Sequence, residues 1–365
     1  MLYTNTPTSL LTWAVSHSSY YVTNQSITVM YNLGMLSGIS FGIQVASGIV
    51  IALSYVGHYD YSFLVLADLM RDGVLGWILR GVHANGASVV FLFMYMHVVR
   101  NMGYSNGTVV YYLVWLAGLI VWLLMMGVAF LGYVLPWGLM SYWALTVITN
   151  LITVIPIVGV DILYYVWGGY YVTSTTLHRL FGMHFLLPFL ILLLLMVHLM
   201  VLHVYGSGNA SITSTGYLDH EHFLIFYYKD LLSALWSIAI FILCIFVYSD
   251  TLHHADNYCY VDRFVTPKHI VPEWYFLPFY ALLRACSNKQ IGVLMLVMGI
   301  VIFLFLVSIH TSLRYSRSLG VEVETGVLVY TLLLLGILGQ SSPIYPYVET
   351  SGVLSVVVFG IHIMF

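Results

Sequence analysis

Long apolar stretches separated by shorter polar ones make up most of this chain. A helix that crosses about 30 Å of hydrocarbon needs about 20 apolar residues. Eight windows meet that length: residues 31–55, 77–103, 110–134, 175–204, 223–247, 290–310, 321–341 and 346–364. We therefore expect an all-α polytopic membrane protein with eight transmembrane helices. An even number of spans places both termini on one side of the membrane.

The windows fall into two groups of four. Residues 1–206 are expected to form an N-terminal region built as a four-helix bundle, and residues 207–365 a C-terminal region with a second helical group. Residues 1–29 are mixed and polar and lack the basic and apolar pattern of a signal peptide, so we expect the spans themselves to direct insertion.

Two connections are longer than a helix hairpin requires, and long loops in compact proteins are usually functional. One is 135–174, which contains an amphipathic piece at 141–152. The other is 248–289, which carries Pro272-Glu273-Trp274-Tyr275. These loops follow the third and fifth spans, so they share one face of the membrane. The loop 206–222 follows the fourth span and lies on the opposite face.

The amino-acid composition excludes several classes of protein. Only 7% of the residues are charged and 61% are hydrophobic, against about 25% charged in a soluble domain. With 11 basic and 14 acidic residues there is no basic surface for nucleic acid. The basic residues are divided between the two faces of the membrane, so their distribution does not determine the orientation of the chain across the membrane. The three cysteines have no C-x-x-C spacing, which leaves the 15 histidines as the main candidate metal ligands.

Four histidines share a common spacing. His83 and His97 are 14 residues apart in the second window, and His184 and His198 are 14 apart in the fourth. Fourteen residues is close to four helical turns, so each pair shares one helix face at a separation of about 21 Å. The second and fourth spans run in the same direction. His83 can therefore face His184, and His97 can face His198, as two stacked bis-histidine sites.

A single histidine on an apolar helix is usually a satisfied core residue, but two matched pairs are poorly explained that way. Two neutral imidazoles without carboxylates or thiolates suit a low-spin haem better than zinc, which requires four ligands. The sequence thus predicts a haem-binding four-helix bundle.

Glycines repeat the same interval on the first and third spans, which run the other way. They are Gly34 and Gly48, and Gly118 and Gly132. Small residues allow close approach in membrane bundles. Helix direction predicts that Gly48 and Gly132 lie beside His83 and His184, and that Gly34 and Gly118 lie beside His97 and His198.

Two arginines lie one turn outside the histidines of the second span. Arg80 precedes His83 and Arg100 follows His97. Each is placed to pair with a haem propionate near a membrane face. Both could equally be arginines whose side chains extend to the interface from a helix end, and the two interpretations are compatible.

With these residues in view, the chain resembles mitochondrial and bacterial cytochrome b, the di-haem core subunit of the cytochrome bc1 complex. The resemblance covers nearly the whole chain. It rests on the segments Arg80-Gly81-Val82-His83-Ala84-Asn85-Gly86-Ala87-Ser88, Gly132-Tyr133-Val134-Leu135-Pro136-Trp137-Gly138, Thr146-Val147-Ile148-Thr149-Asn150 and Pro272-Glu273-Trp274-Tyr275-Phe276-Leu277. It implies a low-potential haem b at His83 and His184, and a high-potential haem b at His97 and His198.

The resemblance also implies a quinol-oxidising pocket on the long-loop face. Glu273 would accept a proton there, and Tyr133 and Tyr280 would line the pocket. The flanking Pro272, Trp274 and Tyr275, together with Ala144, belong to the same implied site. An alternative is that Glu273 is an interfacial residue paired with Arg284.

A quinone-reducing pocket is implied on the opposite face. His203 and Asp230 would relay protons to the quinone. The other residues implied there are Asn32, Ser207 and Lys229.

Some positions depart from the family pattern. Ala144 stands where most relatives have glycine, and its methyl group can clash with a rigid inhibitor while it tolerates a flat substrate. This predicts insensitivity to strobilurin-type methoxyacrylates. Leu139 replaces a usual glutamine and Tyr31 a usual tryptophan, while Gly208-Asn209-Ala210 lacks a usual proline.

Other classes explain the pattern less well. Plastid cytochrome b6 has a split chain and a wider second histidine interval. A proton-relaying transporter would show inverted repeats with broken helices, and a purely structural subunit leaves the matched intervals unexplained.

The resemblance implies ubiquinone or ubiquinol as substrate, and the mitochondrial inner membrane, or alternatively a bacterial plasma membrane, as the location. Because the chain has no cysteine set for an iron-sulfur cluster and no c-type haem motif, the redox partners are expected to be other subunits. The resemblance implies that these are a Rieske iron-sulfur protein and cytochrome c1. The remaining expected partners are other complex III subunits and membrane lipids, in a dimeric complex.

Overall fold

The fold is almost entirely helical in the computed structural model, which describes residues 12, 21–25, 27–103, 109–205, 207, 220–313 and 319–364. The long helices are α2 (Leu33–Ala52), α4 (Gly76–Gly103), α5 (Val109–Val134), α8 (Ser174–Tyr205), α9 (Tyr227–Phe246), α11 (Lys289–Leu313), α12 (Leu319–Gln340) and α13 (Tyr347–Met364). The shorter ones are α3 (Ser62–Asp72), α6 (Leu139–Asn150), α7 (Gly159–Trp167) and α10 (Leu277–Arg284). Short 3-10 turns are η1 (Val29–Asn32), η2 (Leu151–Val154), η4 (Phe223–Phe226), η5 (Ala255–Tyr258) and η6 (Trp274–Phe276).

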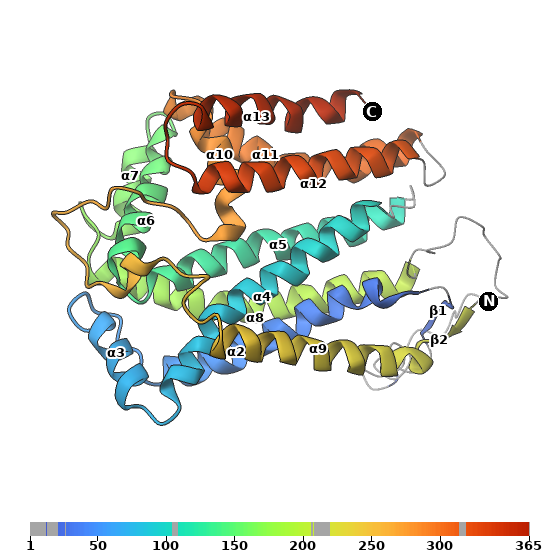
Figure 1. Ribbon diagram of the computed structural model, residues 1–365, viewed down its shortest axis with the longest axis horizontal. Helices are drawn as coiled ribbons and strands as arrows, with labels where there is room; N and C mark the ends of the chain where they lie inside the picture. The colour runs from blue at the N-terminus through green and yellow to red at the C-terminus, as the bar shows by residue number, and fades with distance from the viewer. Residues whose placement is uncertain are drawn as a thin grey trace.

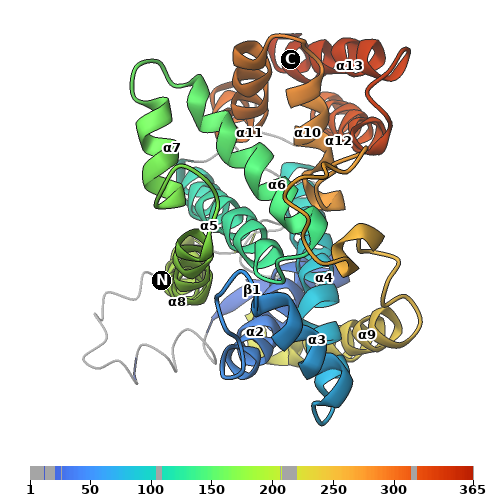
Figure 2. The same ribbon diagram turned by 90° about the vertical axis from the view of Figure 1, so that its left-hand side faces the viewer.

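Four of the long helices form the bundle expected from the first half of the sequence. Helix α2 packs along α4, and α5 packs along α8 (Figures 1 and 2). Helix α9 lies against α2 and α4, whereas α10, α11, α12 and α13 form a second group whose α11 contacts α5. The side chains between α4, α5 and this second group make the largest buried core: examples are Phe91, Met94, Trp122 and Leu282.

Six helices of the described residues are long and apolar enough to cross a membrane: Val29–Ala52, Gly76–Gly103, Tyr112–Val134, Ser174–Val204, Phe223–Phe246 and Val323–Gln340. They coincide with six of the eight predicted windows. The other two windows correspond to α11 and α13, whose described apolar segments, Lys289–Leu304 and Tyr347–Gly360, are shorter. The multi-pass helical prediction is confirmed, and the count of eight stays a prediction.

The outer surfaces of the long helices are apolar. Leu186 and Leu193 of α8 and Trp236 of α9 are each about two-thirds exposed. Helices that are apolar on all sides are typical of membrane spans, because lipid replaces water as their solvent. Helix α8 continues through Pro188 without a break.

One end of the bundle carries both long connections, as the span order predicted. Helices α3, α6 and α7 and turn η5 lie together at that end (Figure 1). The two connections touch each other: the amide of Ser141 donates to Asn257 Oδ1 at 2.9 Å, and Gly138 pairs with Tyr260 in an isolated β-bridge. The expected amphipathic piece 141–152 is α6 and the start of η2, while α3 was not predicted.

At the other end, strand β1 (Val22–Asn24) pairs antiparallel with strand β2 (His220–His222). Most of the loop predicted at 206–222, residues 208–219 with Gly208-Asn209-Ala210, lies outside the described residues. Strand β1 and the carboxyl end of α13 both point to this end of the molecule (Figure 1). The pairing attaches the segment before η1 to the start of α9.

Candidate functional site

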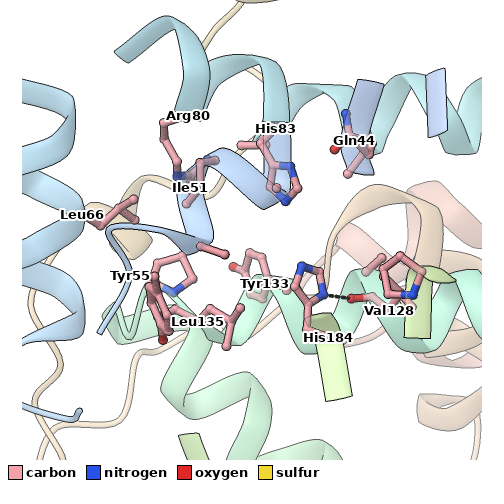
Figure 3. A pocket seen from close by; sticks show the side chains of 18 of the residues that line it. Gln44, Ile51, Tyr55, Leu66, Arg80, His83, Val128, Tyr133, Leu135 and His184 are labelled. Atoms are coloured by element: carbon pink, nitrogen blue, oxygen red, sulfur yellow. Dashed lines mark hydrogen bonds between the residues drawn. The ribbon is translucent and has the colours of Figure 1, made fainter. Parts of the chain in front are cut away.

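A cavity of about 570 Å³ lies inside the four-helix bundle near the long-loop end (Figure 3). All four bundle helices line it, and the second long connection closes it with His253, Tyr258 and Glu273. Its lining includes His83, Arg80, Gly48, Gly132, His184, Tyr133 and Tyr275 of the sequence-predicted residues.

His83 and His184 face each other across this cavity. Their ring centroids are 6.2 Å apart and the ring planes are nearly perpendicular, at 88°. Figure 3 shows the two rings pointing toward one another from α4 and α8. The pairing predicted from the 14-residue intervals is therefore present in the fold.

Each ring is held by its Nδ1 atom. His184 Nδ1 lies 2.9 Å from the carbonyl oxygen of Val128, and since a carbonyl can only accept, Nδ1 carries the proton. His83 Nδ1 lies 3.0 Å from Ser47 Oγ, whose own proton is directed to the carbonyl of Ile43 at 2.7 Å. In both rings the Nε2 lone pair is left for a metal ion, the usual arrangement of metal-bound histidine.

Glycines on the opposing helices lie where the sequence predicted them. A Cβ atom placed on Gly48 would come within 2.8 Å of His83 Cε1, and one placed on Gly132 would overlap the ring of His184. The same relation holds at the other level, where a Cβ atom on Gly34 or Gly118 would lie 3.1 Å from Cε1 of His97 or His198. At Gly48 and Gly132 no larger residue fits without displacement of the histidine.

The second pair lies at the other end of the same helices. His97 Nε2 is 3.3 Å from Asn101 Nδ2, one turn further along α4. The neighbouring Arg100 donates to Asn101 Oδ1 at 2.7 Å, and its guanidinium carbon lies 3.5 Å from the ring centre of Tyr31. Arg100 is thus held at the helix end, where the sequence predicted a cation.

The residues of the first pair fit a haem. Two imidazoles on one iron, with metal–nitrogen bonds of about 2 Å each, need ring centres separated by about the 6.2 Å that is observed. The cavity and the two glycines provide room for a flat macrocycle. Within the described ranges, no three His, Cys, Asp or Glu side chains gather into a conventional metal site, which disfavours zinc.

Glu273 is directed into the same cavity. Its Oε1 lies 4.0 Å from His253 Nδ1, and the carboxylate interacts electrostatically with Arg80 and Tyr133. The alternative pairing with Arg284 is wrong, because Arg284 donates to the carbonyls of Gly339 and Ser341 at 3.0 and 2.9 Å.

The residues around Glu273 are fixed by packing. Trp274 Nε1 donates to Ser88 Oγ at 3.0 Å. Tyr275 stacks on Phe91 with ring centroids 4.0 Å apart, and its carbonyl accepts a bond from Tyr95 at 2.5 Å. Pro272 precedes this anchored segment, so the glutamate is presented from a rigid support.

Two other residues assigned to this region lie outside the cavity lining. The Tyr280 hydroxyl donates to the carbonyl of Ile270 at 3.0 Å, beneath the guanidinium of Arg284. Ala144 is buried in α6, with 5% of its surface exposed. Their contact with a quinol stays a prediction.

On the opposite face the structure brings some predicted residues together. The ring of His203 stacks on Tyr21, whose hydroxyl lies 3.2 Å from Ser207 Oγ. Asn32 Nδ2 donates to Ser233 Oγ at 2.8 Å, and Lys229 Nζ donates to the carbonyl of Ile27 at 3.0 Å. Asp230 stands in the first turn of α9.

Sequence reasoning assigned no role to four groups that shape these sites. They are Ser47, the carbonyl of Val128, Tyr21 and His253. Ser47 could have been found, because it directly precedes Gly48 and so stands near His83 on α2. Tyr21 and His253 lie outside the periodic apolar windows, so no spacing pointed to them.

Comparison with known proteins agrees with this geometry. Residues 18–206 match the family described as cytochrome b/b6/petB, and residues 260–359 match cytochrome b (C-terminal)/b6/petD. A cytochrome b of Phytophthora megasperma is 39% identical over 344 residues, covering 94% of this chain and 90% of that protein. A cytochrome b of Rickettsia prowazekii is 40% identical over 344 residues, covering 92% and 86%.

A solved structure described as "Hyperthermophilic respiratory Complex III" contains a chain with the same fold. The TM-score is 0.89 at 26% sequence identity, and the match covers 98% of this chain and 95% of that one. The helical bundle, the two histidine pairs and these matches over nearly the full length lead to one conclusion: this chain belongs to the cytochrome b family, whose members are membrane-bound, haem-binding electron-transport proteins.

Proposed function

We propose that this chain is the catalytic core subunit of a ubiquinol–cytochrome c reductase. It oxidises ubiquinol at the long-loop face and reduces ubiquinone at the opposite face, and thereby contributes to a proton gradient. The observation that carries the proposal is the pair His83 and His184, which face each other with both Nδ1 atoms occupied by hydrogen bonds.

Each pair of histidines would hold one haem b, with low potential at His83 and His184 and high potential at His97 and His198. When bound, the two haems supply one-electron carriers at two depths of the membrane. Arg80 and Arg100 stand one turn beyond the histidines of α4, where each can neutralise propionates.

At the long-loop face, the chain's own groups would handle protons. Glu273 accepts a proton from a quinol hydroxyl, because it is the carboxylate that enters the cavity from the second connection. Pro272, Trp274 and Tyr275 hold it in place, and Tyr133 lies within electrostatic reach. Tyr280 and Ala144 complete the proposed pocket wall.

At the other face, protons must be delivered to quinone. His203 and Asp230 are the proposed relay, and Asn32, Ser207 and Lys229 shape the pocket. The stacking of Tyr21 on His203 supports this assignment, since it keeps the imidazole in one orientation beside Ser207.

The wider setting belongs to the same proposal. We infer eight spans, with a haem-binding region at 1–206 and a second region at 207–365. Rieske iron-sulfur protein and cytochrome c1 would accept the other electron of each quinol, within a dimeric complex of further subunits and lipids in the mitochondrial inner membrane. The match to a complex III structure supports this setting. Because some relatives come from Rickettsia, a bacterial membrane is the alternative location, and cell fractionation distinguishes the two.

The test is a potentiometric titration of the purified complex that follows the reduced-minus-oxidised b-band, combined with an assay of cytochrome c reduction by quinol. We expect two non-covalent haems per chain with separable potentials, and a turnover that requires quinol. A folded chain without haem would refute the proposal.

A further inference from the structure

Two histidine–carboxylate pairs lie in the second long connection, and they differ in their surroundings. His253 Nδ1 lies 4.0 Å from Glu273 Oε1, with 15% and 9% of the two side chains exposed. His254 Nδ1 lies 3.9 Å from Asp256 Oδ2, with 27% and 49% exposed. The connection folds back on itself, so that residues 20 positions apart in the sequence meet at the cavity.

The exposed pair has a structural role. His254 Nδ1 accepts the amide of Asp256 at 3.2 Å and caps the turn η5. That nitrogen is therefore occupied by the backbone, and the pair does not line the cavity.

The buried pair has no such role. His253 and Glu273 both line the cavity, and His253 Nε2 is buried without a hydrogen-bond partner. A buried imidazole nitrogen without a partner is costly unless it is used. The 4.0 Å separation is too long for a hydrogen bond, so a proton transfer between the two groups requires the carboxyl group to rotate toward the imidazole.

We propose that His253 takes over the proton that Glu273 receives from quinol and releases it toward the long-loop face. This inference rests on the proposed function and adds the next proton acceptor to it. In the step, the O–H bond of the Glu273 carboxylic acid breaks and an N–H bond forms at His253 Nδ1. The second N–H bond, at Nε2, then breaks and gives its proton to water. No electrons change hands in either transfer.

Histidine suits this position because it exchanges protons near neutral pH and has two nitrogens that can act on opposite sides of the ring. Arg80 interacts electrostatically with Glu273, so the carboxylate enters the cavity beside a positive charge.

Other titratable groups face the same space and must be separated from His253 in any pH profile. From the other elements these are Tyr55, Arg71, Arg80, His83, Tyr133 and His184, and from the same connection Tyr258 and Tyr275. Tyr258 is engaged elsewhere, since its hydroxyl donates to Asp250 at 2.8 Å.

The test compares His253→Asn with His254→Asn in the assembled complex. Asparagine places an amide near the Nδ1 position in both variants but carries no exchangeable charge at neutral pH. We expect H253N to lower quinol-dependent turnover at least about tenfold, with unchanged KM for quinol and an unchanged b-band. H254N is expected to stay within about twofold, because asparagine also caps a helical turn.

Two further measurements distinguish a relay from a packing effect. H253N should change the pH dependence of turnover, and added imidazole should restore part of the rate. In an E273Q background, H253N should cause no further loss, since both residues serve one path. If the H253N complex lacks its b-band, the same measurements are made on His253→Gln, whose amide lies near the Nε2 position of the imidazole.

If H253N keeps the turnover and the pH profile of the wild type while E273Q is slowed, the relay is overturned and the proposed function is left intact. A loss of turnover whose pH profile is unchanged would also overturn the relay. A haem-loaded wild-type complex without quinol–cytochrome c reductase activity would instead overturn the proposed function itself.

Discussion

His203 lies face to face with Tyr21, with ring centroids 4.2 Å apart and ring planes at 15°. The hydroxyl of Tyr21 reaches Ser207, and Asn24 of the same strand donates to the Ser207 carbonyl at 3.1 Å. The amide of Phe223 in turn donates to the Tyr21 carbonyl at 2.8 Å. Residues far apart in the sequence thereby fix one imidazole at the proposed quinone-reducing face.

Loss of this stacked ring should slow quinone reduction. Aromatic pairs contribute about 0.5–1.5 kcal/mol beyond burial, so we expect Tyr21→Leu to lower the rate roughly two- to tenfold. The rate is measured as reoxidation of the reduced b-band by added quinone with the quinol-oxidising site blocked. Tyr21→Phe keeps the stack and loses only the contact with Ser207, so it serves as the control. Equal rates in Y21L and the wild type would contradict the role assigned to Tyr21.

A side chain at Gly48 should prevent binding of one haem. Even a Cβ atom there lies 2.8 Å from His83, so Gly48→Val fills the space that the macrocycle requires. We expect the b-band to fall to about half, since the other site is about 21 Å away along the helix. Gly42→Val on the same helix is the matched control, because a Cβ atom at Gly42 meets nothing within 4 Å. A full b-band in G48V would exclude haem at this pair.

Removal of the Ser47 hydroxyl should raise the potential of the haem held by His83. The hydroxyl accepts a hydrogen bond from Nδ1–H of His83 and makes the imidazole a stronger electron donor, which favours oxidised iron. A hydrogen bond contributes about 1 kcal/mol, and about 59 mV corresponds to a tenfold change for one electron, so Ser47→Ala should shift the potential by about 40 mV. Potentiometric titration measures it, with the haem at His97 and His198 as the internal reference. A shift to lower potential would contradict the assigned direction.

Alkaline pH should destabilise the extramembrane parts of the fold. Burial raises the pKa of the phenols of Tyr21, Tyr55 and Tyr275 above the ordinary value. Above about pH 10 the unfolded chain releases these protons while the folded chain retains them, so stability is full below that pH and falls as pH rises. Phenolate absorbance, followed together with loss of helical signal, measures it. Because the chain has 30 tyrosines, single Tyr→Phe variants at the three positions identify their share of the phenolate signal. Loss of signal near pH 10 in such a variant, with the protein fully folded, would show that the replaced ring is accessible.

Replacement of Ala144 by glycine should alter inhibitor sensitivity. The residue is buried in α6, where a methyl group occupies space that a glycine would leave open. We expect the wild-type enzyme to resist methoxyacrylates and Ala144→Gly to become sensitive, with little change in quinol turnover. Concentrations for half inhibition of cytochrome c reduction measure the effect. Strong inhibition of the wild type would show that the methyl group does not restrict the pocket.

The sequence by itself determined the membrane class and the pairing of histidines. Apolar windows long enough to cross a bilayer leave helices as the available structure, because every backbone group must be bonded within the span. Since α-helical geometry is regular, the 14-residue interval between His83 and His97 places both on one helix face, at two fixed depths along the helix. The same regularity placed Gly48 beside His83 and Gly132 beside His184.

The tertiary structure alone decided the contacts made by irregular segments. Nothing in the local pattern shows that His253 meets Glu273, that Tyr21 covers His203, or that Arg284 bonds to the carbonyls of Gly339 and Ser341 rather than to Glu273. Such loops have no repeating geometry, so their side-chain neighbours are set by how separate connections pack at the bundle ends. Helix periodicity therefore predicted the centre of this protein, and only the packed fold shows which side chains of the connecting segments meet at its ends.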